Sequence, residues 1–110
     1  MSTLSTHVLD AASGNPAGGM RVTLEHRDDG RWRPLGDGVT DADGRVRDLA
    51  PGSLAPGTHR LVFATGDYFT ATGQAGFYPE VSVTFTVADE RHYHVPLLLI
   101  PYAFSTYRGS

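Results

Sequence analysis

The chain has 110 residues, and its nine basic residues against twelve acidic ones leave a formal charge of −3 at neutral pH. All the basic residues are arginines, and they form no basic run. Nucleic acid is therefore not an expected partner, because phosphate binding needs a concentrated positive surface. The absence of cysteine excludes disulfides, thiolate metal sites and a cysteine nucleophile. This length suits a single domain that spans residues 1–110.

The N-terminal segment MSTLSTHVLD has none of the features of a targeting signal. It lacks the basic start and the apolar core of about 7 to 15 residues that mark a secretory signal. No stretch of the chain approaches the roughly 20 apolar residues that a membrane-spanning helix needs. We therefore expect a cytoplasmic protein that has no membrane partner.

The chain is divided into short segments by 13 glycines and 7 prolines, and most segments are rich in Val, Leu, Thr, Phe and Tyr. This composition is typical of strands. In VSVTFTVA the apolar residues alternate with Ser and Thr, which is the period of a strand with one buried face. The same reasoning predicts strands near residues 4–10, 20–28, 31–40, 45–49, 58–65, 81–87, 92–100 and 102–108.

Two turns and one short helix complete the predicted elements. The dipeptide Asp29-Gly30 indicates a tight hairpin, because Asp-Gly tolerates the positive φ that such turns need. The segment TDADGR predicts a second turn, which ends at Arg45. Between residues 66 and 76 the two-residue alternation is lost, so we expect a short helix there with Asp67 as its cap. Many short strands without a long helix favour an all-β antiparallel sandwich.

Histidines are the first candidates for chemistry. His92 and His94 are two residues apart on a predicted strand, so both face the same way and could bind a metal or exchange protons. A zinc site would need at least three protein ligands, and the sequence alone brings no third ligand to this pair. His7 lies on the first strand, on the face that it shares with Ser5 and Leu9. The simpler interpretation of each is an ordinary strand histidine.

Other motifs argue against several kinds of site. The sequence DADG at 41–44 resembles the start of a calcium loop, but Gly52 stands where such a loop needs its closing Glu. A turn that orients Arg45 is the better interpretation. The chain contains neither a G-x-S-x-G nucleophile elbow nor a phosphate-binding glycine motif, which argues against covalent serine catalysis and nucleotide binding.

Several motifs taken together resemble one known family. In chain order they are LSTHVLD, TDADGR, TGDYF, FYPE, HYHVPLLL and the terminal STYRGS. With these motifs, which run from Leu4 to Ser110, the chain is identified as a member of the 5-hydroxyisourate hydrolases, the enzyme branch of the transthyretin-related family. The terminal YRGS is the marker that separates these hydrolases from the hormone-carrying transthyretins.

The resemblance implies a fold, an assembly and a reaction. The fold would be a transthyretin-like (prealbumin-like) β-sandwich of two four-stranded sheets with one short helix. The assembly would be a homotetramer with its active sites at the dimer–dimer interface, and no metal or other cofactor would be used. The reaction would be the hydrolysis of a small-molecule substrate, 5-hydroxyisourate, to 2-oxo-4-hydroxy-4-carboxy-5-ureidoimidazoline in urate degradation.

The same resemblance assigns roles to individual residues. His7, Arg45, His94 and Ser110 would be catalytic, and His7, Arg45 and Tyr107 would bind the substrate. These residue types suit the reaction, because a neutral histidine can activate water and an arginine can stabilise the oxyanion that forms at the attacked carbonyl. Which histidine is the base stays open, as does whether Ser110 acts through its hydroxyl or its carboxylate.

The chain departs from the family pattern near its end. Ile100 stands where serine is common, and Tyr102-Ala103-Phe104 replaces the usual Tyr-Gly-Tyr. We interpret these departures as repacking. A second hypothesis, a carrier of a small aromatic ligand, fits the same fold. A passive apolar pocket, however, would leave the polar candidate groups unpaired at a cost of about 1 to 3 kcal/mol each.

Overall fold

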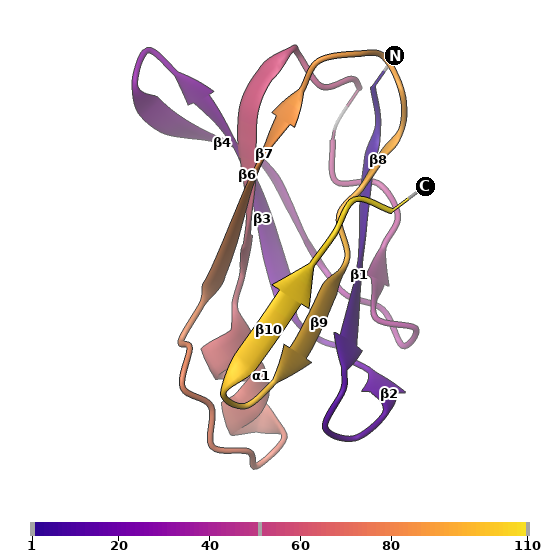
Figure 1. The fold of residues 1–110 in the computed structure, drawn as a ribbon, viewed down its shortest axis with the longest axis vertical. Helices are drawn as coiled ribbons and strands as arrows, with labels where there is room; N and C mark the ends of the chain where they lie inside the picture. Colours follow the sequence, from indigo (N-terminus) through magenta and orange to yellow (C-terminus); the bar gives the residue numbers. More distant parts are fainter. Residues whose placement is uncertain (1, 51, 110) are drawn as a thin grey trace.

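The computed structural model describes residues 2–50 and 52–109, and their strands form two sheets (Figure 1). The first sheet has the order β10 (Ala103–Thr106), β9 (Leu97–Ile100), β1 (Leu4–Asp10) and β2 (Asn15–Pro16), and β5 (Arg45–Val46) and β8 (Tyr93–His94) also pair with β1. The second sheet has the order β4 (Arg31–Val39), β3 (Arg21–Asp28), β6 (Gly57–Phe63) and β7 (Val81–Val87). The short helix α1 (Thr65–Ala71) follows β6.

The two sheets enclose one hydrophobic core. In β1, burial alternates as predicted, since Leu4, Thr6, Val8 and Asp10 are buried and the residues between them are partly exposed. Burying a large apolar side chain contributes about 1.5 to 3 kcal/mol. The inward-facing apolar side chains of the two sheets therefore supply most of the stability of the sandwich. Its largest fully buried apolar side chains are Leu4, Val8, Met20, Val22, Leu24, Leu61, Phe63, Phe69, Val87, Leu97 and Leu99.

The pairing of β1 differs from the antiparallel arrangement that the sequence predicted. This strand lies parallel to β8 and β9, with Ser5 opposite His94 in the register. It pairs with β5 in the antiparallel sense, with His7 opposite Arg45. The first, middle and last parts of the chain therefore meet along β1.

Strands of the first sheet also differ in extent from the prediction, and β10 (Ala103–Thr106) is shorter than the expected strand 102–108. The expected strand 92–100 is divided into β8 and β9 at Val95-Pro96, because proline has no N–H to donate to a sheet. The expected strand 45–49 pairs only over β5, and β2 was not predicted. The first sheet consequently has six strands where four were expected, whereas the second has four.

The hairpin and the helix lie where the sequence placed them, but the cap of the helix does not. Asp29 and Gly30 have φ of 53° and 74°, as a tight hairpin requires. Helix α1 begins at Thr65, after Ala64 as the N-cap residue and without a side-chain cap. Asp67 lies in the first turn instead, where a negative charge interacts favourably with the helix dipole. The hydroxyl of Tyr68 donates to Oδ2 of buried Asp10 at 2.8 Å, which fastens the helix to β1.

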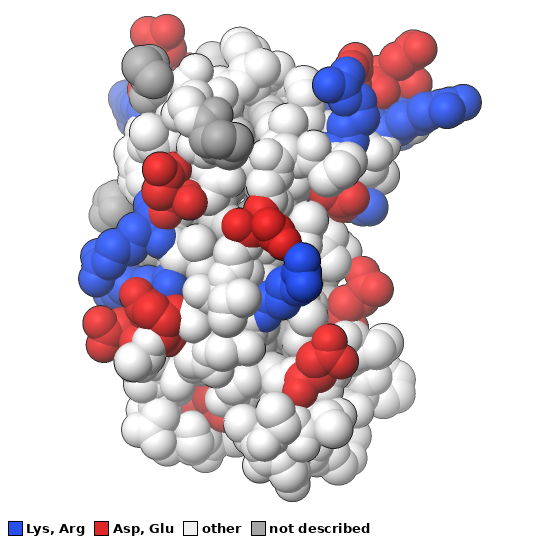
Figure 2. Space-filling model, turned by 180° about the vertical axis from the view of Figure 1, so that it is seen from behind, with Lys and Arg blue, Asp and Glu red and all other residues white. Residues whose placement is uncertain are grey.

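Charged side chains of both signs are interspersed on the face that Figure 2 shows. Ion pairs join β3 to both of its neighbours in the second sheet. They are Arg21–Asp37 and Arg33–Asp28 to β4, and Arg60–Glu25 to β6. The two pairs to β4 are exposed and contribute about 0 to 1 kcal/mol each, whereas Arg60–Glu25 is partly buried. Nowhere in the described ranges is a helix long and apolar enough to cross a membrane.

Candidate active site

A cavity of about 310 Å³ lies beside β1, β5 and β8. Its polar lining consists of Ser5, Thr6, Arg45, Arg47, His92 and His94. We call it the His94 cavity. It brings together two of the predicted site residues, Arg45 and His94, which are far apart in the sequence, and it adds polar groups from β1.

Arg45 is held by the turn that precedes β5. Oδ1 of Asp41 accepts hydrogen bonds from the backbone N–H groups of Asp43 at 2.9 Å and Arg45 at 3.0 Å. The bond from the Arg45 backbone is the main reason that the pKa of Asp41 is lowered. Gly44 has φ of 75°, and a Cβ there would lie 2.4 Å from the carbonyl oxygen of Val8, so only glycine fits. The predicted turn at DADG is confirmed, and it fixes the backbone of Arg45.

The surroundings of His94 lower the pKa of its imidazole. Its Nδ1 lies 2.8 Å from Oγ of Ser5 on the neighbouring strand β1. Burial lowers its pKa below the usual value of 6.5, and the positive charge of Arg45 and the nearby His7 and His92 lower it further. His94 is therefore held neutral at neutral pH, which is the state that a general base requires.

His7 lies next to this group but is not among the residues that line the His94 cavity. It faces outward on β1, on the side of Ser5, as the alternation predicted. Its cross-strand partner is Arg45, and its charge also acts on the pKa of His94. The sheet therefore places His7, Arg45 and His94 as neighbours, although no two of them are adjacent in the sequence.

The C-terminal segment is tied to His94. The N–H of Gly109 donates to the carbonyl oxygen of His94 at 2.8 Å, and the two residues form an isolated antiparallel bridge. A Cβ added at Gly109 would lie 2.5 Å from Cδ2 of His94. Glycine at this position therefore allows the backbone to approach the imidazole ring closely.

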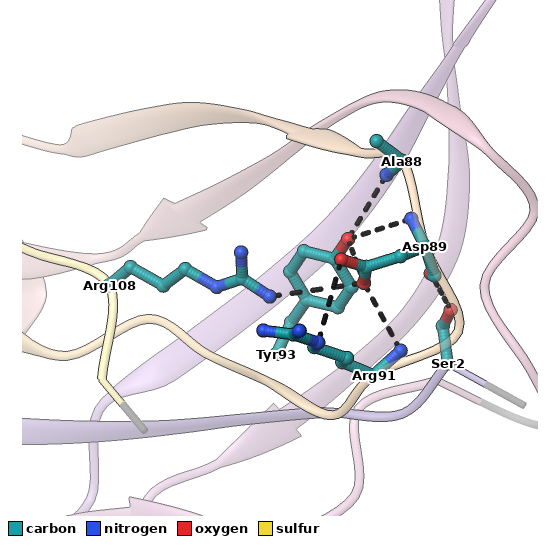
Figure 3. A network of polar contacts seen from close by, with 6 residues as sticks. All are labelled: Ser2, Ala88, Asp89, Arg91, Tyr93 and Arg108. Atoms are coloured by element: carbon teal, nitrogen blue, oxygen red, sulfur yellow. Dashed lines mark hydrogen bonds and ion pairs between the residues drawn. The ribbon is translucent and has the colours of Figure 1, made fainter.

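Arg108 fastens the same segment to the loop that precedes β8 (Figure 3). Its guanidinium lies 4.4 Å from the centre of the Tyr93 ring, and one of its nitrogens lies 4.0 Å from Oδ1 of Asp89. The hydroxyl of Tyr93 donates to Asp89 at 2.9 Å and accepts from the backbone N–H groups of Ala88 and Asp89. The hydrogen bond from Tyr93 is the largest cause of the lowered pKa of Asp89. Arg108 thus contacts protein groups rather than the His94 cavity.

Tyr107 and Ser110 complete the set of predicted site residues. Tyr107 is exposed and lines a second hollow beside the His94 cavity, which we call the C-terminal hollow. The residues of this hollow are Arg91, His92, Tyr107, Arg108 and Gly109, so His92 lines both spaces. Ser110 lies outside the described residues.

Sequence reasoning missed Ser5 and left His92 without a role. Oγ of Ser5 lies 2.8 Å from Nε2 of His92 as well as from Nδ1 of His94, which confirms that the two histidines face the same side. The other ring nitrogen of His92 contacts Oγ1 of Thr3. The one available signal was that Ser5 shares a face with His7. Over the part of the chain that the structure describes, no three His, Asp or Glu side chains are close enough to hold a metal ion.

The departures from the family pattern lie in another part of the first sheet. Ile100 and Phe104 line an apolar hollow with Ala11 and Leu98, and this hollow shares no residue with the His94 cavity. The ring of Phe104 packs edge-on against Tyr78 with a centroid distance of 5.1 Å. This contact agrees with the interpretation of the departures as repacking.

Comparisons with known proteins agree on the fold and on the family. The fold is a transthyretin-like β-sandwich. The model of the HIUase/Transthyretin family matches residues 4–109. The chain is 48% identical to a 5-hydroxyisourate hydrolase of Caulobacter vibrioides over 115 residues, which covers 100% of both chains. The chain therefore belongs to the HIUase/Transthyretin family.

Solved structures include both branches of this family. A 5-hydroxyisourate hydrolase of Klebsiella pneumoniae has a TM-score of 0.91 at 36% identity and covers 100% of both chains. Sea bream transthyretin, solved in complex with thyroxine, also has a TM-score of 0.91, at 34% identity, and the match covers 96% of this chain and 93% of that one. The predicted fold is confirmed, and because both branches share it, the function has to be argued from the site.

Proposed function

We propose that this protein hydrolyses 5-hydroxyisourate to 2-oxo-4-hydroxy-4-carboxy-5-ureidoimidazoline. The observation that carries the proposal is the meeting of His7, Arg45 and His94 along β1. Opening the ring requires an activated water, a donor to the oxyanion at the attacked carbonyl, and a proton for the leaving nitrogen. A neutral imidazole beside a permanent cation can supply all three.

His94 would take the proton from the attacking water. Its lowered pKa keeps it neutral across the physiological range, and a positioned acid–base group contributes about 10² to 10⁴ in rate. His7, beside Arg45, would share these proton transfers with His94. The rate should then fall only when the pH drops below the lowered pKa of His94.

Arg45 would bind the carbonyl oxygen where negative charge develops. Its backbone is fixed by Asp41 and by pairing with His7, so the guanidinium extends from a rigid base. A charge that is already in place stabilises the oxyanion without a reorganisation cost during the reaction. Tyr107 would bind the heterocycle from the C-terminal hollow. Ser110, in the same C-terminal segment, would be catalytic.

A homotetramer with sites at the dimer–dimer interface is part of the proposal. Strand β10 is the edge of the first sheet, and all of its residues are exposed. Tyr102, Phe104 and Tyr107 at or beside this edge are 67%, 40% and 60% exposed. An open edge with exposed aromatic side chains is a ready surface for pairing with another chain. Light scattering of the purified protein measures the assembly, and cell fractionation tests the cytoplasmic location.

The alternative is a carrier that holds a small aromatic ligand without turning it over. Its fold would be the same, as the match to thyroxine-bound sea bream transthyretin illustrates. The His94 cavity, however, is lined mainly by arginine, histidine and hydroxyl groups. Such groups suit a polar heterocycle that is being hydrolysed better than they suit an apolar ligand.

The test is to add 5-hydroxyisourate, freshly generated by urate oxidation, and to follow its decay by ultraviolet absorbance. We expect the protein to accelerate the decay, and Arg45→Ala and His94→Ala each to lose about 10² or more in kcat/KM while they stay folded. Arg33→Ala, which removes an arginine of an exposed ion pair on β4, is the matched control and should stay fully active. Decay at the spontaneous rate with the wild-type protein would refute the proposal.

A further inference from the structure

Ser5 lies between two histidines. Its hydroxyl oxygen is 2.8 Å from Nε2 of His92 and 2.8 Å from Nδ1 of His94. The far nitrogen of His92, Nδ1, contacts the hydroxyl of Thr3. The four side chains form an unbroken row from exposed His92 and partly buried Thr3 to the half-buried ring of His94.

The number of protons in this row limits which side chain donates and which accepts in each hydrogen bond. A serine hydroxyl has one proton to donate, so Ser5 can donate to only one of the two rings and must accept from the other. If His94 carries its proton on Nδ1, it donates to Ser5, Ser5 donates to Nε2 of His92, and Nδ1 of His92 donates to Thr3. Nε2 of His94 is then the unprotonated nitrogen, as a general base requires.

We propose that Ser5 and His92 are positioning residues that hold His94 in the Nδ1-protonated tautomer and accept its Nδ1 proton during catalysis. This inference rests on the proposed hydrolase activity. In the step, an O–H bond of water breaks and an N–H bond forms at Nε2 of His94. The Nδ1 proton of His94 passes to Ser5, and the original Ser5 proton passes to Nε2 of His92. The positive charge comes to rest on His92, and the reverse transfers return the proton to the leaving nitrogen.

Electrostatics favour moving this charge outward. Asp89 pairs with Arg91 and Arg108, and Tyr107 lines the C-terminal hollow. The other charged and titratable groups around His94 and His92 are cationic or can become so. They are His7 from β1, Arg45 and Arg47 from β5 and the segment after it, and Arg91 and Arg108 beside the C-terminal hollow. A proton kept on half-buried His94 would be repelled by Arg45, whereas exposed His92 is screened by solvent.

Among the described residues that line the two hollows, the group placed to orient the imidazole of His94 is a hydroxyl rather than a carboxylate. In many enzymes a carboxylate orients the catalytic histidine. Neither Asp nor Glu is among the described residues that line the His94 cavity or the C-terminal hollow. The hydroxyl of Ser5, which also contacts His92, lies 2.8 Å from Nδ1 of His94.

The experiment compares the full-length wild-type protein with Ser5→Ala, Ser5→Thr and His92→Gln. We expect Ser5→Ala and His92→Gln to lose about tenfold or more in kcat, with a smaller change in KM, as part of the roughly 10² to 10⁴ that a positioned acid–base group contributes. Ser5→Thr keeps the hydroxyl and should recover most of the activity. Nitrogen NMR of the imidazoles should find His94 protonated mainly at Nδ1 in the wild type, and this preference should be lost in Ser5→Ala.

The possible outcomes separate the two proposals. If the wild type fails to accelerate hydrolysis, the proposed function is wrong and the relay is wrong with it. If the wild type is active and Ser5→Ala matches it in kcat, pH profile and His94 tautomer, only the relay is wrong. Should Ser5→Ala fail to fold, His92→Gln decides alone, because His92 is exposed and its loss should not unfold the protein.

Discussion

Adding one methyl group at Gly109 should displace the ring of His94. A Cβ at this position would lie 2.5 Å from Cδ2 of His94 and 3.1 Å from its Cγ. Carbon atoms in good contact are about 3.5 to 4.0 Å apart, so either the ring or the C-terminal segment must move by about 1 Å. The ring is held by Ser5 and the segment by the 2.8 Å bond from the N–H of Gly109, so the movement weakens one of these contacts.

The expected cost falls on activity rather than on folding. A misplacement of about 1 Å at a reacting group can reduce the rate by about 10²-fold. Loss of one backbone hydrogen bond costs about 0.5 to 1.5 kcal/mol of stability, which should leave the sandwich folded. The assay is kcat for hydrolysis of 5-hydroxyisourate by Gly109→Ala, with denaturant unfolding measured in parallel. The control, Ala71→Ser, adds one atom at the exposed end of α1 and should change neither quantity.

Two results would refute this reasoning. Wild-type kcat in Gly109→Ala, together with unchanged NMR signals of His94, would show that the contact does not position the ring. A loss of activity that is fully explained by unfolding would assign Gly109 to stability alone.

Two further predictions concern stability. Burial lowers the pKa of His59 below 6.5 and so penalises its charged form in the folded state. The unfolded chain therefore binds more protons at low pH, and the free energy of unfolding should decrease as pH falls below about 6.5, by up to about 1.4 kcal/mol per pH unit. Urea unfolding at several pH values checks this slope, His59→Leu should reduce it, and equal slopes in the two proteins would contradict the assignment. Tyr68→Phe removes a donor to the buried carboxylate of Asp10 and should cost about 1.5 to 3 kcal/mol. A loss below about 0.5 kcal/mol in denaturant unfolding would mean that the other donors to Asp10 are sufficient.

Local features of the fold could be predicted from the sequence. The bounds of β1 and β7 agree with the prediction, because two-residue alternation directly reports a strand with one buried face. The hairpin at Asp29-Gly30 and the turn before Arg45 depend on a few adjacent residues, and both are confirmed. The cap of α1 was wrong because a Ser, Thr, Asp or Asn near a helix start does not fix which residue begins the helix.

Strand partners could not be predicted in the same way. The alternation in β1 shows which face is buried, but it does not say that β1 lies parallel to β8 and antiparallel to β5. The interruption at Pro96 is understandable from its missing N–H, yet the sequence pattern read across it as one strand. The family resemblance supplied the candidates His7, Arg45 and His94, and the register of β1 shows how they come to be neighbours.

The sequence by itself determined which residues could do chemistry and which face of each strand they occupy. It placed His7 with Ser5 on one face and His92 with His94 on one face, because side chains alternate along a strand. Only the tertiary structure decided that these two faces meet. Ser5 and His92 are separated by 87 positions, and their contact depends on parallel pairing between the first strand and β8. That pairing is set by the burial of the whole sandwich, to which residues throughout the chain contribute and which no local pattern contains.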